Sequence, residues 1–393
     1  MKSENITALS ERHGTPFYLF DEDILKKRIS YLKSFLPDTV SLCYAVKANT
    51  FLTPYMVGLV ERFEVCSPGE LAICINQKIP YEQLVISGVY KTPDIIKKSV
   101  LSHGSAGYYT VESISQLELL KSAALEAGEK IKVLLRLTSG NQFGLNQEEI
   151  EKIIQTQNCS DCIEICGIQY FSGTQKKSVK KFKRELSYLD SFIKELKTQY
   201  DFTTEELEYG TGFPVCYFEG EEWDEPTFLE EFCALLESLD YAGHITLEIG
   251  RSLVASCGCF VTKGVDKKQN ATGNYAIADG GINHLAYYGQ MMAMKHPFME
   301  HIPVRENDIK HWNICGSLCT ANDILVKDVA LGDLHIGDLF VFKNTGAYCP
   351  MEGISLFLSR DLPAVLMCTS DGSVSVLREH KEIYQLNHSY LED

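Results

Sequence analysis

The residue of this chain whose type and setting could do chemistry most directly is Lys47, which lies inside an apolar run at residues 42–49, LCYAVKAN. The run predicts a short buried strand, and lysine is almost never buried without a partner. Desolvation lowers the pKa of a lysine and makes its amine nucleophilic, which suits a Schiff base with a carbonyl cofactor such as pyridoxal phosphate. A lysine at a strand end, with its ammonium in solvent, is the alternative, and the downstream residues decide between the two.

Two downstream motifs could bind a phosphate group. Residues 210–212 (GTG) directly follow one strand-like run, and residues 248–251 (EIGR) follow the next. Strand–helix barrels often bind phosphate at the loops after their seventh and eighth strands, through backbone N–H groups and a nearby cation. A Gly-x-Gly pair alone is a weak signal. Together with the arginine of the second motif and with Lys47, it predicts a site for a phosphorylated cofactor.

These motifs need a framework, and strand-like and helix-like segments alternate from residue 22 to about 252. The repetition implies a parallel sheet, and eight repeats predict an α/β fold closed into a (β/α)8 TIM-like barrel. An open doubly wound sheet is the alternative, but no dinucleotide fingerprint follows the first strand. The predicted strands are 41–47, 63–66, 84–87, 107–110, 131–137, 163–171, 205–209 and 245–249, and the predicted helices are 69–77, 93–101, 113–127, 147–157, 177–199 and 227–239.

The pattern changes after residue 252. Short strand-like runs, broken by turn sequences such as Asp279-Gly280-Gly281, predict a C-terminal all-β domain, either a sandwich or a barrel. Residues 16–20 (PFYLF) form a further strand candidate for it. We therefore divide the chain into a cofactor-binding barrel at 22–252 and a β domain made of 1–21 and 253–393. The C-terminal runs lie at 253–262, 274–279, 338–342 and 363–369.

Composition excludes several classes of function. The net charge of -16 argues against a nucleic-acid-binding protein, which would be basic. No stretch approaches the roughly 18 apolar residues of a membrane span, and residues 1–5 lack the apolar core of a signal peptide. Fourteen cysteines in such a chain predict free thiols and a cytoplasmic protein.

Three of the cysteines, Cys159, Cys162 and Cys166, are spaced closely enough to suggest a metal site. Residues 162–168 (CIEICGI) have the apolar pattern of a strand, however, and no fourth ligand is evident nearby. We therefore predict no metal.

Read in order, the motifs resemble those of the fold-type III pyridoxal-phosphate decarboxylases, the diaminopimelate and ornithine decarboxylase family related to alanine racemase. The likeness spans nearly the whole chain. It rests on YAVKAN at 44–49, EVCSPGEL at 64–71, GTGFP at 210–214, EIGR at 248–251, GSLC at 316–319 and GAY at 346–348.

The resemblance implies a decarboxylase that uses pyridoxal 5'-phosphate, with Lys47 as the residue that binds the cofactor covalently. Glu248 would pair with the pyridine nitrogen and keep it protonated, so that the ring accepts the electrons left when CO2 departs. Alanine racemases place an arginine there, so Glu248 favours decarboxylation over racemisation. Cys319 would enter the site from a partner subunit and protonate the α carbon, which implies a homodimer with shared active sites. The remaining cofactor-binding residues would be Gly210, Thr211, Gly212, Gly250, Arg251 and Tyr348.

One departure from the family concerns the cofactor ring. Residues 167–174 read GIQYFSGT where the family usually has Gly-Leu-His-Phe-His-Ile-Gly-Ser. Phe171 therefore replaces the histidine that stacks on the ring. A phenylalanine still stacks, but it neither titrates nor donates a hydrogen bond.

The other departures concern the substrate. Thr320 stands where decarboxylases of basic amino acids place an acidic residue against the distal ammonium, and the loss of a buried charge partner costs several kcal/mol of binding. The diaminopimelate enzymes carry Arg-Pro where this chain has Tyr287-Tyr288. Thr320, Asp323 and Tyr287 are thus the candidate substrate-binding residues, and free diaminopimelate is not expected. A rival interpretation has Asp323 bind the ammonium instead.

The Cys319-Thr320 pair, with residues 170–175 (YFSGTQ) and 301–306 (HIPVRE), resembles the decarboxylases of natural-product pathways. Some of these act on a glutamyl group tethered to an acyl-carrier protein. The substrate is therefore either a small amino acid or derivative, or a carrier-linked aminoacyl group. Two other classes stay open: a racemase, which Glu248 disfavours, and a catalytically silent homologue, which would have lost Lys47 or Cys319.

Overall fold

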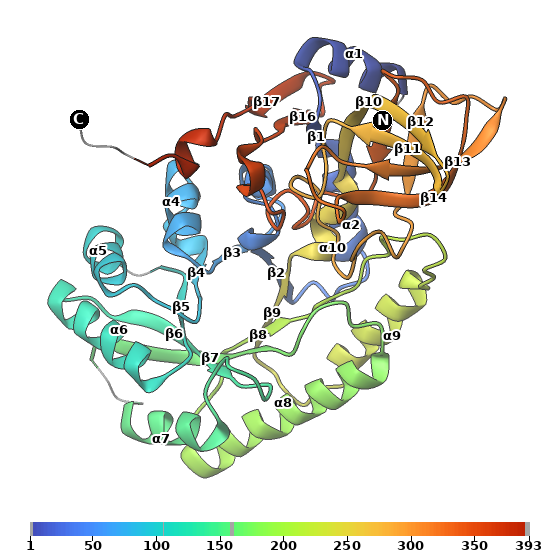
Figure 1. Cartoon of the computed structure of the whole chain (residues 1–393). Coiled ribbons are helices and arrows are strands. Elements are labelled where there is room, and N and C mark those ends of the chain that lie inside the picture. The colour runs from blue at the N-terminus through green and yellow to red at the C-terminus, as the bar shows by residue number, and fades with distance from the viewer. Residues whose placement is uncertain (1–2, 105, 158–160, 390–393) are drawn as a thin grey trace. The chain divides into compact units, whose positions relative to one another are not determined.

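The computed structural model of the chain describes residues 3–104, 106–157 and 161–389. It contains two compact units, which Figure 1 shows in one view. The barrel unit comprises Ile29–Pro214 and Trp223–Arg251. The β unit comprises the N-terminal residues up to Arg28, Val215–Glu222 and the chain from Ser252 onward. Each unit is described by itself.

Eight parallel strands close the barrel unit, and the first strand pairs with both the second and the last. The predicted (β/α)8 barrel is confirmed, and each predicted strand matches an observed one to within two residues. The match is close because most of these strands are short, largely apolar runs, such as VSLCYA at 40–45 and LVI at 84–86, that stand out from the helices between them. The strands are β2 (Val40–Ala45), β3 (Arg62–Val65), β4 (Leu84–Ile86), β5 (Tyr108–Val111), β6 (Ile131–Leu137), β7 (Ile163–Phe171), β8 (Glu206–Gly210) and β9 (His244–Ile249).

The helices between these strands begin and end at ordinary signals. Ser67 and Ser113 cap α4 and α6 by accepting hydrogen bonds from backbone N–H groups, and Gly128 ends α6 in a left-handed conformation. The helix α8 buries one apolar face at helical spacing, including Phe182, Leu186 and Leu189. Helix α2 (Glu22–Lys33) precedes β2, and the helices between the strands are α3 (Thr53–Met56), α4 (Pro68–Asn76), α5 (Pro93–His103), α6 (Ile114–Ala127), α7 (Gln147–Gln157), α8 (Val179–Tyr200) and α9 (Glu225–Glu237).

The barrel interior is polar. Arg62 on β3 forms an ion pair with Glu206 on β8 at 2.9 Å, and these strands are not neighbours, so the pair crosses the interior. On β7 and β8, Gln169 donates a hydrogen bond to Glu208 at 2.8 Å. Such buried groups need partners to offset their desolvation, and the closed barrel supplies them.

The β unit contains one mixed sheet of nine strands, which confirms a second domain built on β structure. The predicted N-terminal strand forms as β1 and pairs with β10 and β16. The helix α1 (Ser3–His13) was not predicted, and its Ile6 packs in the core of this unit. The strands are β1 (Phe17–Asp21), β10 (Gly258–Asn270), β11 (Gly273–Ala278), β12 (Met299–Ile302), β13 (Ile309–Cys315), β14 (Ile324–Gly332), β15 (Leu339–Phe342), β16 (Ala364–Cys368) and β17 (Val374–Arg378).

None of the helices in the described part of the chain is long and apolar enough to cross a membrane.

Candidate active site

Lys47 lies just beyond the C-terminal end of β2, in a single 3-10 turn at Val46–Ala48. The prediction of a buried lysine on a strand at 41–47 is wrong in this detail, because the strand ends at Ala45 and the lysine side chain is 36% exposed. The turn is closed by the Asn49 N–H, which donates to the carbonyl of Val46 at 3.1 Å. The amine thus lies at the rim of the barrel, where a ligand can reach it.

Two buried carboxyl groups hold the Lys47 ammonium. Its Nζ lies 2.5 Å from Oε2 of Glu64 on β3 and 3.0 Å from Oε1 of Glu248 on β9. The Glu64 and Glu248 side chains are only 2% and 8% exposed. Because β2 pairs with β3 on one side and with β9 on the other, closure of the barrel brings the three groups together across 201 residues of sequence.

The two carboxyl groups differ in proton affinity. Burial raises the pKa of Glu64, but the Lys47 ammonium and hydrogen bonds from Glu248 and Lys47 outweigh burial and lower it to about 2. Burial and the negative charge of Glu64 raise the pKa of Glu248 to about 7, against the attraction of Lys47. One ammonium thus balances one carboxylate, and the second carboxyl group holds a proton near neutral pH.

The predicted phosphate loop, Gly210-Thr211-Gly212, begins at the last residue of β8 and admits no side chain at its glycines. A Cβ on Gly212 would lie 2.0 Å from the carbonyl oxygen of Gly173, and the φ of Gly212 is +58°. A Cβ on Gly210 would lie 2.5 Å from the ring of Phe171. The N–H of Gly212 has no hydrogen-bond partner among the residues that the structure describes. A bare backbone with a free donor suits an anion such as phosphate.

Arg251 completes this cradle at the end of β9. Its side chain is buried, and its Nε donates to Oγ1 of Thr174 at 3.2 Å. Gly250 precedes it. The loops after β7, β8 and β9 therefore meet, and Phe171 pairs with Gly210 at the ends of their strands. Together with Lys47 and Glu248, these residues fit pyridoxal phosphate: an amine for its carbonyl carbon, an acid for its ring nitrogen and donors for its phosphate.

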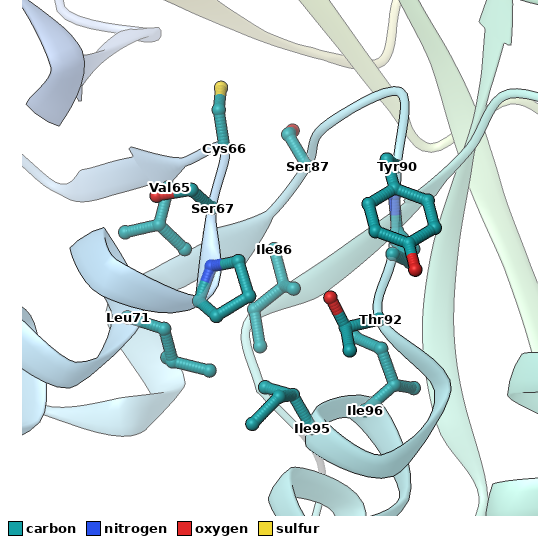
Figure 2. Close-up of a pocket in the computed structure, with 12 residues that line it drawn as sticks. Val65, Cys66, Ser67, Leu71, Ile86, Ser87, Tyr90, Thr92, Ile95 and Ile96 are labelled. Carbon is teal, nitrogen blue, oxygen red and sulfur yellow. The ribbon is translucent and has the colours of Figure 1, made fainter. Parts of the chain in front are cut away.

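A small cavity borders the site at the C-terminal ends of β3 and β4. Its volume is about 20 Å³, which is space for one water molecule and too little for an amino acid. In Figure 2 the side chains of Leu71, Ile86 and Ile95 surround a common space, while the thiol of Cys66 points away from them. That thiol lies 3.7 Å from Nζ of Lys47. Cys66 therefore separates the cavity from the Lys47 amine.

The β unit contains the predicted cysteine loop, between β13 and β14. Cys319 is exposed there, and Thr320 is half-buried, with its hydroxyl accepting only a long 3.4 Å hydrogen bond from the Asn322 N–H. Both side chains are therefore available to a ligand.

Asp323 has a different role from the one considered for it. Its side chain is buried, and its two carboxylate oxygens accept hydrogen bonds from the N–H groups of Ile282 at 2.9 Å and Leu318 at 2.7 Å. A Cβ on Gly281 or Gly316 would come within 2.5 Å of this carboxylate. Asp323 thus joins two loops, and it is only 2% exposed, so its burial argues against a substrate ammonium at this carboxylate.

Tyr287 and Tyr348 also lie in the β unit. Tyr287 is buried between the rings of Tyr217 and Phe218, and its hydroxyl donates to the carbonyl of Lys343 at 2.5 Å. These contacts are those of a core residue rather than of a substrate ligand. Tyr348 is half-buried and has a left-handed backbone, with φ of +63°.

Two residues of the site were not identified from sequence. Glu64 is part of the EVCSPGEL motif but was given no role, although it lies on the strand that pairs with β2. No sequence motif pointed to Glu208. Burial and the charges of Glu248 and Glu64 raise its pKa to about 8.

Glu164, Cys166 and Glu205 form one group whose ligand atoms are close enough to bind a metal. Burial raises the pKa of the Cys166 thiol to about 12, which weakens it as a ligand. Of the other cysteines considered for a metal, Cys162 is not in this group, and Cys159 lies outside the described residues.

Comparisons with known proteins agree with this geometry. The family described as "Pyridoxal-dependent decarboxylase, pyridoxal binding domain" matches residues 22–255. An L-glutamyl-[BtrI acyl-carrier protein] decarboxylase of Niallia circulans is 27% identical over 95% of this chain and 93% of its own length. A diaminopimelate decarboxylase of Aquifex aeolicus is 26% identical over 98% and 93%.

Solved structures share the fold. Diaminopimelate decarboxylase from M. jannaschii, in complex with L-lysine, aligns with a TM-score of 0.83 at 24% identity and covers 95% of this chain and 92% of its own. Lysine/ornithine decarboxylase from Vibrio vulnificus, in complex with putrescine, aligns with a TM-score of 0.81 at 21% identity, over 93% and 97%. The chain therefore belongs to the pyridoxal-dependent decarboxylases and is a carboxy-lyase with pyridoxal phosphate as its cofactor.

Proposed function

We propose that this enzyme removes CO2 from an L-amino acid whose distal end carries no ammonium, and that an acyl-carrier protein presents this substrate. The loop from Cys319 to Asp323 is the observation that carries the proposal. Thr320 is uncharged, and both carboxylate oxygens of Asp323 are engaged by backbone N–H groups. Asp323 is also only 2% exposed, so a distal ammonium would lack an accessible charge partner on this loop, whereas an amide or thioester needs none.

Pyridoxal phosphate, when bound, supplies an electron sink for the electrons that the departing CO2 leaves behind. Lys47 is the residue that would bind it covalently. Glu248, which lies 3.0 Å from Nζ of Lys47, would pair with the ring nitrogen and keep it protonated. Glu64 stays ionised beside Lys47 and would hold positive charge there.

The remaining barrel residues would position the cofactor. Gly210, Thr211, Gly212 and Arg251 would hold the phosphate, with Gly250 and the β unit's Tyr348 completing that set, and Phe171 would stack on the ring. In this division the barrel holds the cofactor, and the β unit supplies Cys319, which would return a proton to the α carbon after CO2 leaves.

The similarity to the carrier-protein glutamyl decarboxylase of Niallia circulans supports a tethered substrate. The diaminopimelate decarboxylases among the relatives act on a substrate with a distal ammonium and carboxylate, a group for which Thr320 and the buried Tyr287 offer no charge. A glutamyl thioester is therefore the substrate we favour.

A substrate screen tests the proposal. The purified enzyme would be incubated with diaminopimelate, lysine, ornithine and glutamate as free amino acids, and with L-glutamyl thioesters of pantetheine and of a carrier protein, and CO2 release would be measured. We expect release from the thioesters. Efficient turnover of lysine, ornithine or diaminopimelate would refute the proposed substrate class.

We also propose a cytoplasmic homodimer in which each active site takes residues from both subunits. The thirteen cysteines in the described part of the chain are all free, as expected in a reducing compartment. If Lys47 and Cys319 of one site come from different subunits, mixing Lys47→Ala with Cys319→Ala protein should restore up to about a quarter of wild-type activity. No recovery, when subunit exchange is verified with a labelled tag, would exclude shared sites.

A further inference from the structure

A strongly basic segment follows β7 at the rim of the barrel. Six of the nine residues at 176–184, KKSVKKFKR, are lysine or arginine and none is acidic, although the chain as a whole has a net charge of -16. The segment covers the end of the β7–α8 loop and the first turns of α8, the long helix on the outside of the barrel in Figure 1. This local charge is therefore opposite in sign to that of the whole molecule.

Most of these cations are exposed and unpaired. Lys177, Lys180, Lys183 and Arg184 are exposed and make no hydrogen bond or ion pair with any residue that the structure describes. On a helix, Lys180 lies next to both Lys183 and Arg184, and like charges at this spacing are destabilising. The positive end of the α8 dipole adds to the positive potential, and the Ser178 side chain does not cap it. An acidic surface placed here would relieve this repulsion.

The segment is anchored beside the phosphate cradle. Lys176, its first residue, is buried: its Nζ donates to Glu185 at 2.9 Å and Ser172 at 3.1 Å, and its backbone N–H donates to the carbonyl of Gly212 at 3.0 Å. In a parallel barrel, each helix begins at the rim where the preceding strand ends, and Lys47 lies at that rim. The exposed cations therefore begin one residue beyond a rigid contact with the cofactor site.

We propose that Lys177, Lys180, Lys183 and Arg184 form the docking surface for the carrier protein that presents the substrate, an inference that rests on the carrier-linked function proposed above. Carrier proteins are small acidic helical proteins, and they hold their cargo as a thioester on a pantetheine arm that is joined to the protein through a phosphodiester. An enzyme with a charge of -16 would repel such a partner except at a basic surface. Tyr188, 40% exposed and four residues after Arg184, adds an aromatic contact of the kind that interfaces favour.

A pair of charge-reversal variants on α8 tests this surface. Lys180→Glu/Lys183→Glu reverses the docking surface, and Lys194→Glu/Lys197→Glu makes the same change further along the same helix, where both lysines form exposed ion pairs with aspartates. Each enzyme would be assayed with L-glutamate loaded on a holo-acyl-carrier protein and with the same aminoacyl group on pantetheine alone. Cofactor absorbance and thermal midpoint would verify that both variants fold.

We expect the docking-surface variant to lose about tenfold or more in kcat/KM for the carrier-linked substrate, through KM, and to show a weaker dependence on salt. Its kcat/KM for the pantetheine thioester should match the wild type, and the control variant should match the wild type on both substrates. Equal losses on both substrates, or no loss on the carrier-linked one, would overturn the docking surface while leaving the decarboxylase function intact.

Failure of the wild type to act on either thioester would instead overturn the proposed function. A second measurement tests whether the basic surface binds another polyanion instead of the carrier protein. Binding of the wild type to anionic phosphatidylglycerol vesicles or to an oligonucleotide would be compared with its binding to the carrier protein. Tighter, surface-dependent binding to vesicles or oligonucleotide would overturn the carrier as the partner.

Discussion

Glu208→Gln should remove a large part of the pH dependence of stability in the cofactor-free protein. Glu208 is fully buried on β8, one carboxylate oxygen accepts a hydrogen bond from Gln169 at 2.8 Å, and the other has no partner among the described residues. Burial and the charges of Glu248 and Glu64 raise its pKa from 4.5 to about 8. Glutamine keeps the shape and the accepting oxygen but does not titrate, so the substitution isolates the proton.

The sign follows from proton binding. Between pH 4.5 and about 8 the folded protein holds a proton on Glu208 that the unfolded chain has released. The stabilisation by this group is complete below pH 4.5 and is lost as the pH rises through about 8. The pKa difference corresponds to an upper limit of about 5 kcal/mol, and we expect roughly 2 to 5 kcal/mol less decline in the variant than in the wild type between pH 5 and 8.5.

Urea unfolding of the cofactor-free proteins, followed by far-UV circular dichroism at pH 5, 6, 7, 8 and 8.5, measures this difference. Glu230→Gln, at an exposed position of α9, is the matched control and should keep the wild-type profile. Glu248 contributes a decline of the same sign in both proteins, so the difference between the two profiles reports Glu208 together with its coupling to Glu248. Parallel profiles for the wild type and Glu208→Gln would show that Glu208 is ionised in the fold and would refute the reasoning.

Three further predictions concern the cofactor and the substrate. Borohydride reduction should attach the cofactor to a Lys47 peptide in the wild type, and mass spectrometry should find no adduct in Lys47→Ala; an adduct elsewhere would contradict the assignment. Gly212→Ala should weaken cofactor binding at least about tenfold, because its Cβ would lie 2.0 Å from the Gly173 carbonyl oxygen. Gly220→Ala is the control: it is also at positive φ but has no neighbour within 4 Å, and it should not weaken binding. Fluorescence titration with pyridoxal phosphate distinguishes the two, and equal affinities would argue against the cradle. Thr320→Glu should improve kcat/KM for lysine or ornithine relative to the glutamyl thioester by an interaction of about 1–3 kcal/mol, and a lack of change would remove Thr320 from the substrate pocket.

Local sequence patterns were sufficient for the framework. Most barrel strands are short, largely apolar runs between helices of different period, so all eight strands and their closed parallel arrangement could be predicted without a structure. The glycine motif at 210–212 could also be identified from sequence, because a turn without room for side chains requires glycines close together in the chain. The chemistry of single motifs, such as the amine of Lys47, belongs to this local information.

The surroundings of those groups could not be read in the same way, because burial and charge depend on residues that are distant in sequence. Only closure of β2 against β3 and β9 places Glu64 and Glu248 on the Lys47 ammonium and separates their pKa values. Only the packing of two loops commits Asp323 to the N–H groups of Ile282 and Leu318. The sequence by itself determined the barrel and the identity of its reactive groups, whereas the tertiary structure decided their protonation and their availability, because desolvation and Coulomb energies are set by neighbours in space.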